Sequence, residues 1–357
     1  MTFTKCEGKS FEDSSLAELV YMKKDTLLTI SERTGYSIST VSRVLSGKGK
    51  KYRISQQAID YISEEARLCN YTPNLIAQSL RTRKTNTIGL TIPNIDNPFF
   101  STLSGVIINQ LKKCGYNIIL SDTMENVDNE VEALNSFISR NVDGIIAVPV
   151  SSDPQYMEEI SKTVPVVLID RYFENTTLPY VCTDNYYGAY AAAEHLISKG
   201  YKRLLAIQGV PASMPNKERL RGFRQAIEDN TGKGIQAMVC GDSFSLENGY
   251  REVMKALQSQ QRPDAVFTFS NTILLGAIKA IRELGLRIPE DVAIISFDNN
   301  RFLDFLDPAI TRVEQPISLI GKMVTDNMVR MIESEGNDSW ESFQVLVRPS
   351  LIMGRSC

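Results

Sequence analysis

Residues 27–45, LLTISERTGYSISTVSRVL, contain two short helical patterns separated by a turn, and this stretch decides the fold of the N-terminal part of the chain. The first pattern covers 27–33. Gly35 follows it, where a glycine readily takes the positive φ of a tight turn. Ser37 stands where a helix N-cap is expected, and the second pattern covers 38–45. Two helices joined by a glycine turn predict a helix-turn-helix, whose second helix enters the major groove of DNA.

The second helical pattern has an apolar side and a polar side. The apolar stripe is predicted from the spacing of Ile38, Val41, Val44 and Leu45. The other side holds small hydroxyl residues and one arginine: Ser39, Thr40, Ser42 and Arg43. Small side chains let a helix approach base edges closely, and an arginine can make two parallel hydrogen bonds to a guanine. The sequence therefore predicts that this face reads DNA.

A third helical pattern and a short segment that begins with proline follow. The pattern at 55–69 is expected to close the core of the head with Ala58, Ile59, Ile62, Ala66 and Leu68. Pro73 cannot lie inside a helix but can begin one, which predicts a helix of about two turns over 74–80. So short a helix is marginal alone in water, which favours a segment that folds on DNA over the alternative, an ordinary linker helix.

The charge of the chain differs between its two parts. The whole sequence has 39 basic and 42 acidic residues, a net charge of −3. Residues 26–86 carry ten basic and four acidic groups, whereas residues 87–357 carry 25 and 33. A small basic head on a large acidic body predicts a polyanion partner for the head, and a solvated basic face is the alternative.

Several function classes are not expected from this sequence. No apolar run reaches the roughly 18 residues that cross a bilayer, and the acidic start lacks an export signal, so we expect a cytoplasmic protein. Six scattered cysteines predict reduced thiols, and His195 is the one histidine, so no metal site is expected. The GxSxG, GxxxxGK[ST] and GxGxxG motifs do not occur, so we expect neither an enzyme nor a cofactor.

Residues 87–357 alternate between apolar runs and helical patterns. Strands are predicted at 87–92, 117–120, 144–148, 164–169, 203–207, 265–269 and 292–297. Helices are predicted to begin near residues 98, 128, 184, 216, 245 and 271. Continuous Val/Ile runs between helices indicate parallel sheets covered on both faces, and the length indicates two α/β subdomains in series.

Polar and aromatic residues follow several of these predicted strands. Asn97, Phe99 and Phe100 come after the first strand, Asp170 follows the fourth, and Asp298 follows the last. Ligands of parallel sheets bind beyond the carboxyl ends of the strands. Carboxylates, amides and guanidinium groups beside flat aromatic faces suit a polyol. Each residue by itself also fits a structural role, an ion pair for the charged groups and a core plug for the aromatic pair.

The sequence resembles the LacI/GalR (lactose-repressor) family, and the motifs TVSRVL at 40–45 and YTPN at 71–74 carry the resemblance, which continues to the C-terminus. It implies an all-α helix-turn-helix head at 26–72 and a hinge helix with linker at 73–86, after an N-terminal extension, 1–25. It also implies an effector-binding and dimerisation body at 87–357, similar to periplasmic binding proteins. The expected Rossmann-like subdomains cover about 87–184 with 317–343, and about 185–316 with 344–357.

The resemblance implies residues that contact DNA. Residues matching Ile38, Ser39 and Arg43 face bases in the family, and the residue matching Leu80 wedges into the minor groove. The full expected set is Ser37, Ile38, Ser39, Thr40, Ser42, Arg43, Lys50, Lys51, Asn74, Ala77, Gln78, Leu80 and Arg81. The stretch 47–53 is longer than in the lactose repressor. Its basic residues are expected to contact phosphate or, equally, to lie in a solvated loop.

The resemblance also implies an effector site between the subdomains. The expected set is Asn97, Phe99, Phe100, Asp170, Arg171, Arg219, Ser270, Asp298 and Gln315. The Asp-Arg pair and the Asn-Pro-Phe-Phe run favour a sugar over a purine, whereas Ser270 departs from the Asn-Asp of many relatives, so the ligand's identity stays open. The prediction is a homodimeric, sugar-responsive regulator of carbohydrate-metabolism genes, a repressor in the first place with an activator left open, that binds a near-palindromic DNA operator. The alternative is a sugar-converting enzyme or sugar carrier with an added basic head.

Overall fold

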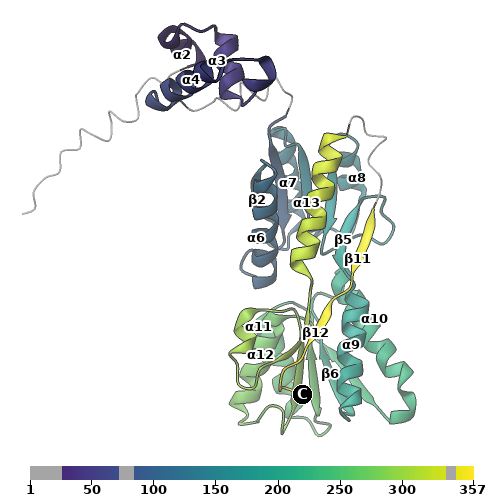
Figure 1. The fold of residues 1–357 in the computed structure, drawn as a ribbon. Helices are drawn as coiled ribbons and strands as arrows, with labels where there is room; N and C mark the ends of the chain where they lie inside the picture. The colour runs from purple at the N-terminus through teal and green to yellow at the C-terminus, as the bar shows by residue number, and fades with distance from the viewer. Residues whose placement is uncertain (1–25, 72–83, 335–342) are drawn as a thin grey trace, which may run out of the picture. The chain divides into compact units, whose positions relative to one another are not determined.

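The computed structural model of the protein describes residues 26–71, 84–334 and 343–357, drawn in colour in Figure 1. The chain divides into two compact units at the bond between Arg83 and Lys84. The extension predicted at 1–25 and the hinge helix predicted at 74–80 lie outside the described residues. No helix among the described residues is long and apolar enough to span a membrane.

The head is a small helical unit in which each α-helix begins at a capping hydroxyl residue. Its elements are α2 (Leu27–Thr34), α3 (Ile38–Leu45), the 3₁₀ turn η1 (Lys50–Tyr52) and α4 (Gln56–Leu68). The side chain of Ser37 accepts a hydrogen bond of 3.2 Å from the backbone N–H of Thr40. Gly35, with φ 73°, ends α2 and turns the chain into α3, which confirms the predicted helix-turn-helix.

The head core contains most of the apolar residues that the sequence predicts. Its buried members are Ile30, Val41, Val44, Ile62 and Ala66, and Ala58 is also buried. The prediction that Leu68 closes the core is wrong, since Leu68 is 59% exposed, and Ile38 of the predicted apolar stripe is 46% exposed. Ile38 begins α3, one turn before the residues that α2 and α4 cover. Leu68 is two positions after Ala66 and so lies on the opposite side of α4.

The first subdomain of the body is a parallel sheet with helices on both faces (Figure 1). The strand order is β11-β5-β4-β3-β1-β2, with the bounds β1 (Thr87–Ile92), β2 (Asn117–Asp122), β3 (Gly144–Ala147), β4 (Val166–Ile169), β5 (Tyr180–Thr183) and β11 (Gln344–Val347). One face is covered by α6 (Pro98–Lys113) and α13 (Ile317–Glu333), and the other by α7 (Val127–Ser139) and α8 (Gln155–Ser161).

The second subdomain repeats this architecture with one antiparallel edge strand. The order is β12-β10-β9-β8-β6-β7, with the bounds β6 (Arg203–Ile207), β7 (Gln236–Cys240), β8 (Ala265–Thr268), β9 (Ala293–Phe297), β10 (Thr311–Glu314) and β12 (Ser350–Ile352). The paired helices are α9 (Asn185–Ser198) with α10 (Met214–Asp229), and α11 (Leu246–Leu257) with α12 (Asn271–Glu283). Two further 3₁₀ turns are η2 (Thr231–Lys233) and η3 (Arg301–Asp304).

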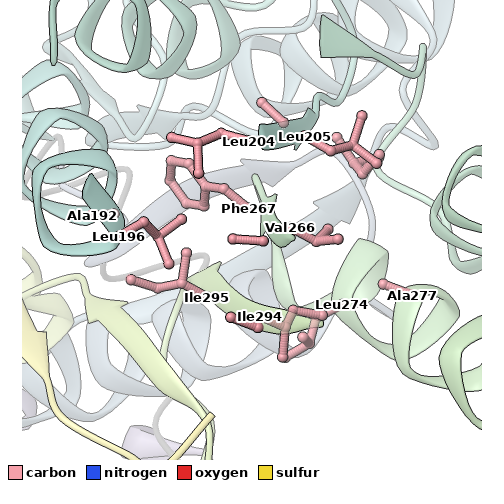
Figure 2. Packing of buried hydrophobic residues seen from close by; sticks show 14 of the residues in the cluster. Ala192, Leu196, Leu204, Leu205, Val266, Phe267, Leu274, Ala277, Ile294 and Ile295 are labelled. Carbon is pink, nitrogen blue, oxygen red and sulfur yellow. The ribbon is translucent and has the colours of Figure 1, made fainter. Parts of the chain in front are cut away.

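Buried side chains on both faces of this sheet explain why its central strands read as continuous apolar runs. Figure 2 shows Phe267 of β8 among its neighbours, with Leu196 of α9 on one side and Leu274 of α12 on the other. The rings of Phe223 and Phe269 lie 6.2 and 5.0 Å from that of Phe267. All seven predicted strands are present in the two sheets, and the prediction of two parallel-sheet subdomains is confirmed.

The chain crosses between the subdomains three times, and two predicted boundaries are wrong. Residues 344–347 form β11, which pairs in parallel with β5 of the first sheet rather than belonging to the second subdomain. The third crossing is therefore at Arg348–Pro349, after the crossings near Asp184 and Gln315. Residues 84–86, expected in the linker, belong to the body, because the N–H of Thr85 donates a 2.8 Å hydrogen bond to Asp143.

Candidate functional site

The exposed side of α3 carries the predicted DNA-reading residues. Ser37, Ile38, Ser39 and Arg43 are exposed, and Thr40 and Ser42 are half-buried. The Ser37 hydroxyl lies 2.9 Å from the hydroxyls of both Ser39 and Thr40. The polar face is therefore a row of short, mutually hydrogen-bonded side chains beside one long cation, a surface that fits the major groove.

The turn η1 supports this face through an arginine–aromatic contact. The guanidinium carbon of Arg43 lies 4.2 Å from the centre of the Tyr52 ring, a cation–π geometry. Gly49 lets η1 lie against α4, because a Cβ at this position would meet the side chain of Ile59 at 2.8 Å. Lys50 and Lys51 are exposed on the same turn. The other predicted DNA contacts, Asn74, Ala77, Gln78, Leu80 and Arg81, lie outside the described residues.

The structure brings all nine predicted effector residues to one cavity between the two subdomains. The cavity has a volume of about 30 Å³ and is lined by Asn97, Phe99, Phe100, Asp170, Arg171, Arg219, Ser270, Asp298 and Gln315. Three further lining residues were not predicted: Glu125, Pro215 and Phe244. Each of the three lies on a loop or at a helix start near the carboxyl end of a strand, the edge where ligands of parallel sheets bind.

The aromatic wall of the cavity is fixed by the start of α6. Asn97 caps this helix, and its side-chain oxygen accepts a 3.0 Å hydrogen bond from the N–H of Phe99. Pro98 occupies the first turn, where a missing N–H costs nothing. Phe99 and Phe100 meet edge to face, with ring centres 5.1 Å apart. Phe100 is both a core residue and a lining residue, so the two roles predicted for the aromatic pair coexist.

Two aspartates occupy equivalent places at the ends of the two sheets. Asp170 follows β4 with φ 65°, and Asp298 follows β9 with φ 74°, so both take the left-handed backbone conformation and both are buried. Burial raises the pKa of Asp170 to about 6, against the opposing effect of Arg171. Burial likewise raises the pKa of Asp298, against the opposing effect of Arg219.

Arg171 makes a two-pronged ion pair with Glu125. Its Nη1 and Nη2 donate hydrogen bonds of 2.8 and 2.6 Å to the two carboxylate oxygens of Glu125. The side chain of Arg171 is 8% exposed, and that of Glu125 is 37% exposed. Burial lowers the pKa of Arg171, but the hydrogen bonds that it donates to Glu125 leave the pKa above its ordinary value. The guanidinium is therefore charged, and its planar fork is occupied.

Arg219 of α10 contacts four groups. Its Nε donates to Oδ1 of Asn185 at 2.8 Å, and its Nη1 donates to the carbonyl oxygen of Phe269 at 2.5 Å. Its Nη2 lies 3.9 Å from Oδ1 of Asp298, and its guanidinium lies 3.8 Å from the centre of the Phe297 ring. Burial lowers the pKa of Arg219.

Gln315 connects the cavity to the crossing segments. Its Nε2 donates a 2.6 Å hydrogen bond to Asp298, and its Oε1 accepts one of 2.5 Å from Thr183. Ser270 caps α12, since its hydroxyl accepts from the N–H of Ile273 at 3.2 Å. Each of these polar groups is a fixed donor or acceptor at the cavity, as recognition of ligand hydroxyls requires.

A second, larger cavity of about 470 Å³ lies next to the first and shares Glu125 and Arg171 with it. The inner cavity of about 30 Å³ has room for only one or two water molecules. The inner cavity as described is therefore smaller than a sugar.

Comparisons with known proteins found a matching domain family, similar sequences and similar solved structures. Residues 193–357 match the model of the periplasmic binding protein-like domain. The ribose operon repressor of Halalkalibacterium halodurans is 31% identical over 315 residues, which cover 88% of this chain and 92% of the relative. Two solved structures are also similar. A periplasmic binding protein/LacI transcriptional regulator from Alkaliphilus metalliredigens, complexed with D-xylulofuranose, is 27% identical with a TM-score of 0.66 over 76% of this chain and 98% of that chain. The lac repressor dimer bound to operator and the anti-inducer ONPF is 23% identical with a TM-score of 0.83 over 94% and 99%.

A helix-turn-helix head joined to a body of two α/β subdomains, with a polar cavity between them, defines a DNA-binding transcriptional regulator with a ligand-binding body. The chain belongs to the LacI family of such regulators.

Proposed function

We propose that this regulator binds a near-palindromic operator as a homodimer and responds to a small sugar held between its subdomains, acting in the cytoplasm, where the chromosome lies. The convergence of nine predicted polar and aromatic residues on one cavity carries the sugar proposal. The exposed hydroxyl face of α3, with Arg43 beside it, supports sequence-specific DNA binding. Twofold symmetry of a dimer would place one head on each operator half-site.

The sugar would act on DNA binding through the angle between the subdomains. The body begins at Lys84, next to Thr85, which is bonded to Asp143 of the first subdomain, so a change of that angle would move this end relative to the second subdomain. Residues 74–80 would form a hinge helix on DNA in one state of the body and lose it in the other. A coupling free energy of about 1–3 kcal/mol suffices for such a switch, and it acts in both directions.

The test combines a search for the operator with a search for the sugar. Footprinting across the organism's own promoters should find protected near-palindromic sites, and a thermal-shift screen of mono- and disaccharides should find a stabilising ligand. Binding to the protected site should then change when that sugar is added. The absence of any protected site, with and without the sugars, would refute the proposal.

Asp298 gives this test a matched variant. Asp298→Ala removes the carboxylate that Gln315 and Arg219 face, so it should abolish the response to the sugar while the variant still binds the operator. Calorimetry that finds undiminished sugar affinity in Asp298→Ala would contradict the assigned role of Asp298.

A further inference from the structure

The charges that line the inner cavity are unevenly matched. Glu125, Asp170 and Asp298 are acidic, whereas Arg171 and Arg219 are basic, so the lining has one more carboxyl group than guanidinium group. Glu130 adds a further buried carboxyl group close to Arg171, where it accepts hydrogen bonds from the backbone of Val150 and Ser151. A ligand with a negative charge would therefore meet a lining that has no surplus of positive charge.

The terminal fork of Arg171 and two of the three nitrogens of Arg219 already donate hydrogen bonds within the protein. Both terminal nitrogens of Arg171 donate to Glu125. Arg219 donates to Asn185 and to the carbonyl of Phe269, and its remaining terminal nitrogen faces Asp298. Phosphate and carboxylate groups are usually bound by just such planar forks. An anionic ligand that used the terminal fork of Arg171 would have to displace Glu125, which leaves that carboxylate without its partner.

The larger cavity of about 470 Å³ also has no surplus of positive charge among its described lining residues. Its basic lining residues among the part of the chain described here are Arg171 and Lys217. Arg171 is paired with Glu125, and Lys217 lies 3.5 Å from Glu174. A sugar hydroxyl differs from a phosphate in this setting, since it can donate to the carboxylates and accept from the fixed N–H groups without bringing a charge.

We propose that this cavity selects uncharged polyols and rejects their phosphorylated or carboxylated derivatives, and that Glu125 enforces the choice by occupying the fork of Arg171. The proposal rests on the proposed sugar response. Glu125 acts as a specificity-determining residue, because it occupies the guanidinium nitrogens of Arg171 that a phosphate or carboxylate group would otherwise bind. The sequence prediction did not include Glu125, and the proposal assigns it this role.

The experiment is calorimetry on the full-length protein with matched ligands. The probes are neutral pentoses and hexoses, the phosphate esters of the same sugars, and the corresponding uronic acids. Wild-type protein should bind at least one neutral sugar. The phosphate ester or the uronic acid of that sugar should bind at least about 100-fold more weakly, because its negative charge would lie beside the carboxylates of the cavity without a basic partner. Wild-type protein that binds the anionic form as tightly as the neutral one would overturn the proposal without any variant.

A charge-neutral substitution tests the role of Glu125 itself. Glu125→Gln removes the negative charge beside Arg171, so the ratio of neutral to anionic affinity should fall by about tenfold or more. The ratio is the measured quantity because a general loss of affinity leaves it unchanged. Glu132→Gln, on the exposed side of α7 and away from both cavities, is the control and should keep the wild-type ratio. An unchanged ratio in Glu125→Gln would show that this carboxylate does not set the choice.

The two proposals fail in different ways. If no sugar, neutral or anionic, binds the protein, the proposed sugar response is refuted and the inference with it. If a phosphate ester or a uronic acid binds and its neutral parent does not, the sugar response stands and only the selection of uncharged ligands is refuted.

Discussion

Thr183 donates a hydrogen bond of 2.5 Å from its Oγ1 to Oε1 of Gln315, and this bond joins the end of β5 to the segment that leaves β10. These are two of the three places at which the chain crosses between subdomains. Gln315 also donates to Asp298 at 2.6 Å, so one amide touches both a crossing segment and a carboxylate of the cavity. A ligand that bound Asp298 would therefore contact a partner of Gln315, and the other partner of Gln315 is Thr183 at the first crossing segment.

Removal of the Thr183 hydroxyl should destabilise the body. Thr183→Val leaves Oε1 of the buried Gln315 without its donor, so we expect a loss of about 1–3 kcal/mol in the free energy of unfolding. Urea unfolding followed by fluorescence or circular dichroism measures this loss. Thr325→Val in α13 is the control, because the equally buried Thr325 hydroxyl has no hydrogen-bond partner in the described structure. Equal losses in the two variants would contradict the assigned role of the Thr183 bond.

The buried Asp170 should make stability depend on pH. Its pKa is raised by burial to about 6 in the folded protein, from 3.8 in the unfolded chain, so the folded state holds its proton more tightly. Stability should therefore fall as pH rises from about 4 to about 6 and then level off. Two pKa units correspond to a loss on the order of 2–3 kcal/mol. Unfolding free energies measured at intervals across this range give the profile.

Asp170→Asn isolates this effect from other groups. Asparagine tolerates the left-handed conformation that Asp170 adopts at φ 65°, and it does not titrate. The difference in unfolding free energy between the variant and the wild-type protein should therefore change with pH between about 4 and 6. Asp298, whose pKa is also raised, is present in both proteins. A difference that stays constant across the range would disprove the prediction.

Tyr52 should orient Arg43 for base recognition. Tyr52→Ala removes the ring that lies 4.2 Å from the guanidinium, so discrimination at the base pair that Arg43 is predicted to read should fall several-fold, while Tyr52→Phe keeps it. Competition between the operator and its single-base variants measures the discrimination at each position. Arg43→Ala should lose discrimination at the same position.

The exposed Lys50 provides the contrast for this prediction. Lys50→Ala should weaken binding to the operator and to random DNA alike and lower the dependence of affinity on salt. If Tyr52→Ala behaves in the same way as Lys50→Ala, Tyr52 acts through general affinity and not through Arg43.

Two helical glycines should respond to alanine in opposite directions. A Cβ at Gly222 of α10 would lie 2.1 Å from the backbone oxygen of Tyr186 in α9, so Gly222→Ala forces the two helices apart and destabilises the protein. Gly105 of α6 has nothing within 4 Å of the added Cβ, so Gly105→Ala should stabilise by about 0.5–1 kcal/mol through helix propensity. Thermal unfolding of both variants tests the pair. Stabilisation by Gly222→Ala would show that α9 and α10 are not in such close contact.

The elements that sequence predicts well are those whose residues are buried on both faces. The strand β4, VVLI, is an uninterrupted apolar run and was predicted, whereas β10, TRVE, was not. Arg312 of β10 is buried because its guanidinium donates to Asn299 and Asp304 at 2.7 Å, partners that hydropathy does not reveal. The edge strand β12 is too short, at three residues, to give a pattern.

Most residues of the candidate site could also be predicted from the sequence. The nine predicted residues meet because parallel strands end at a common edge, which the order of strands along the chain already indicates. Glu125 was missed because its place depends on the course of a loop in which its φ is 52°. Phe244 was missed because it follows β7, a strand with exposed residues that the apolar pattern did not indicate. The exposure of Ile38 and of Leu68 depends on which side of each helix is covered by the other helices of the head.

The three crossings have a consequence for how the protein is made. The second sheet is complete only when β12 at 350–352 has been added, and the hydroxyl of Ser356 bonds to Ile294 of β9 at 2.6 Å and accepts from Thr311 of β10 at 2.9 Å. On the ribosome, the nascent first subdomain likewise waits for α13 and β11, which are synthesised after nearly all of the second. Each subdomain therefore needs a segment that is synthesised after most of the other subdomain, β11 at 344–347 for the first and β12 at 350–352 for the second.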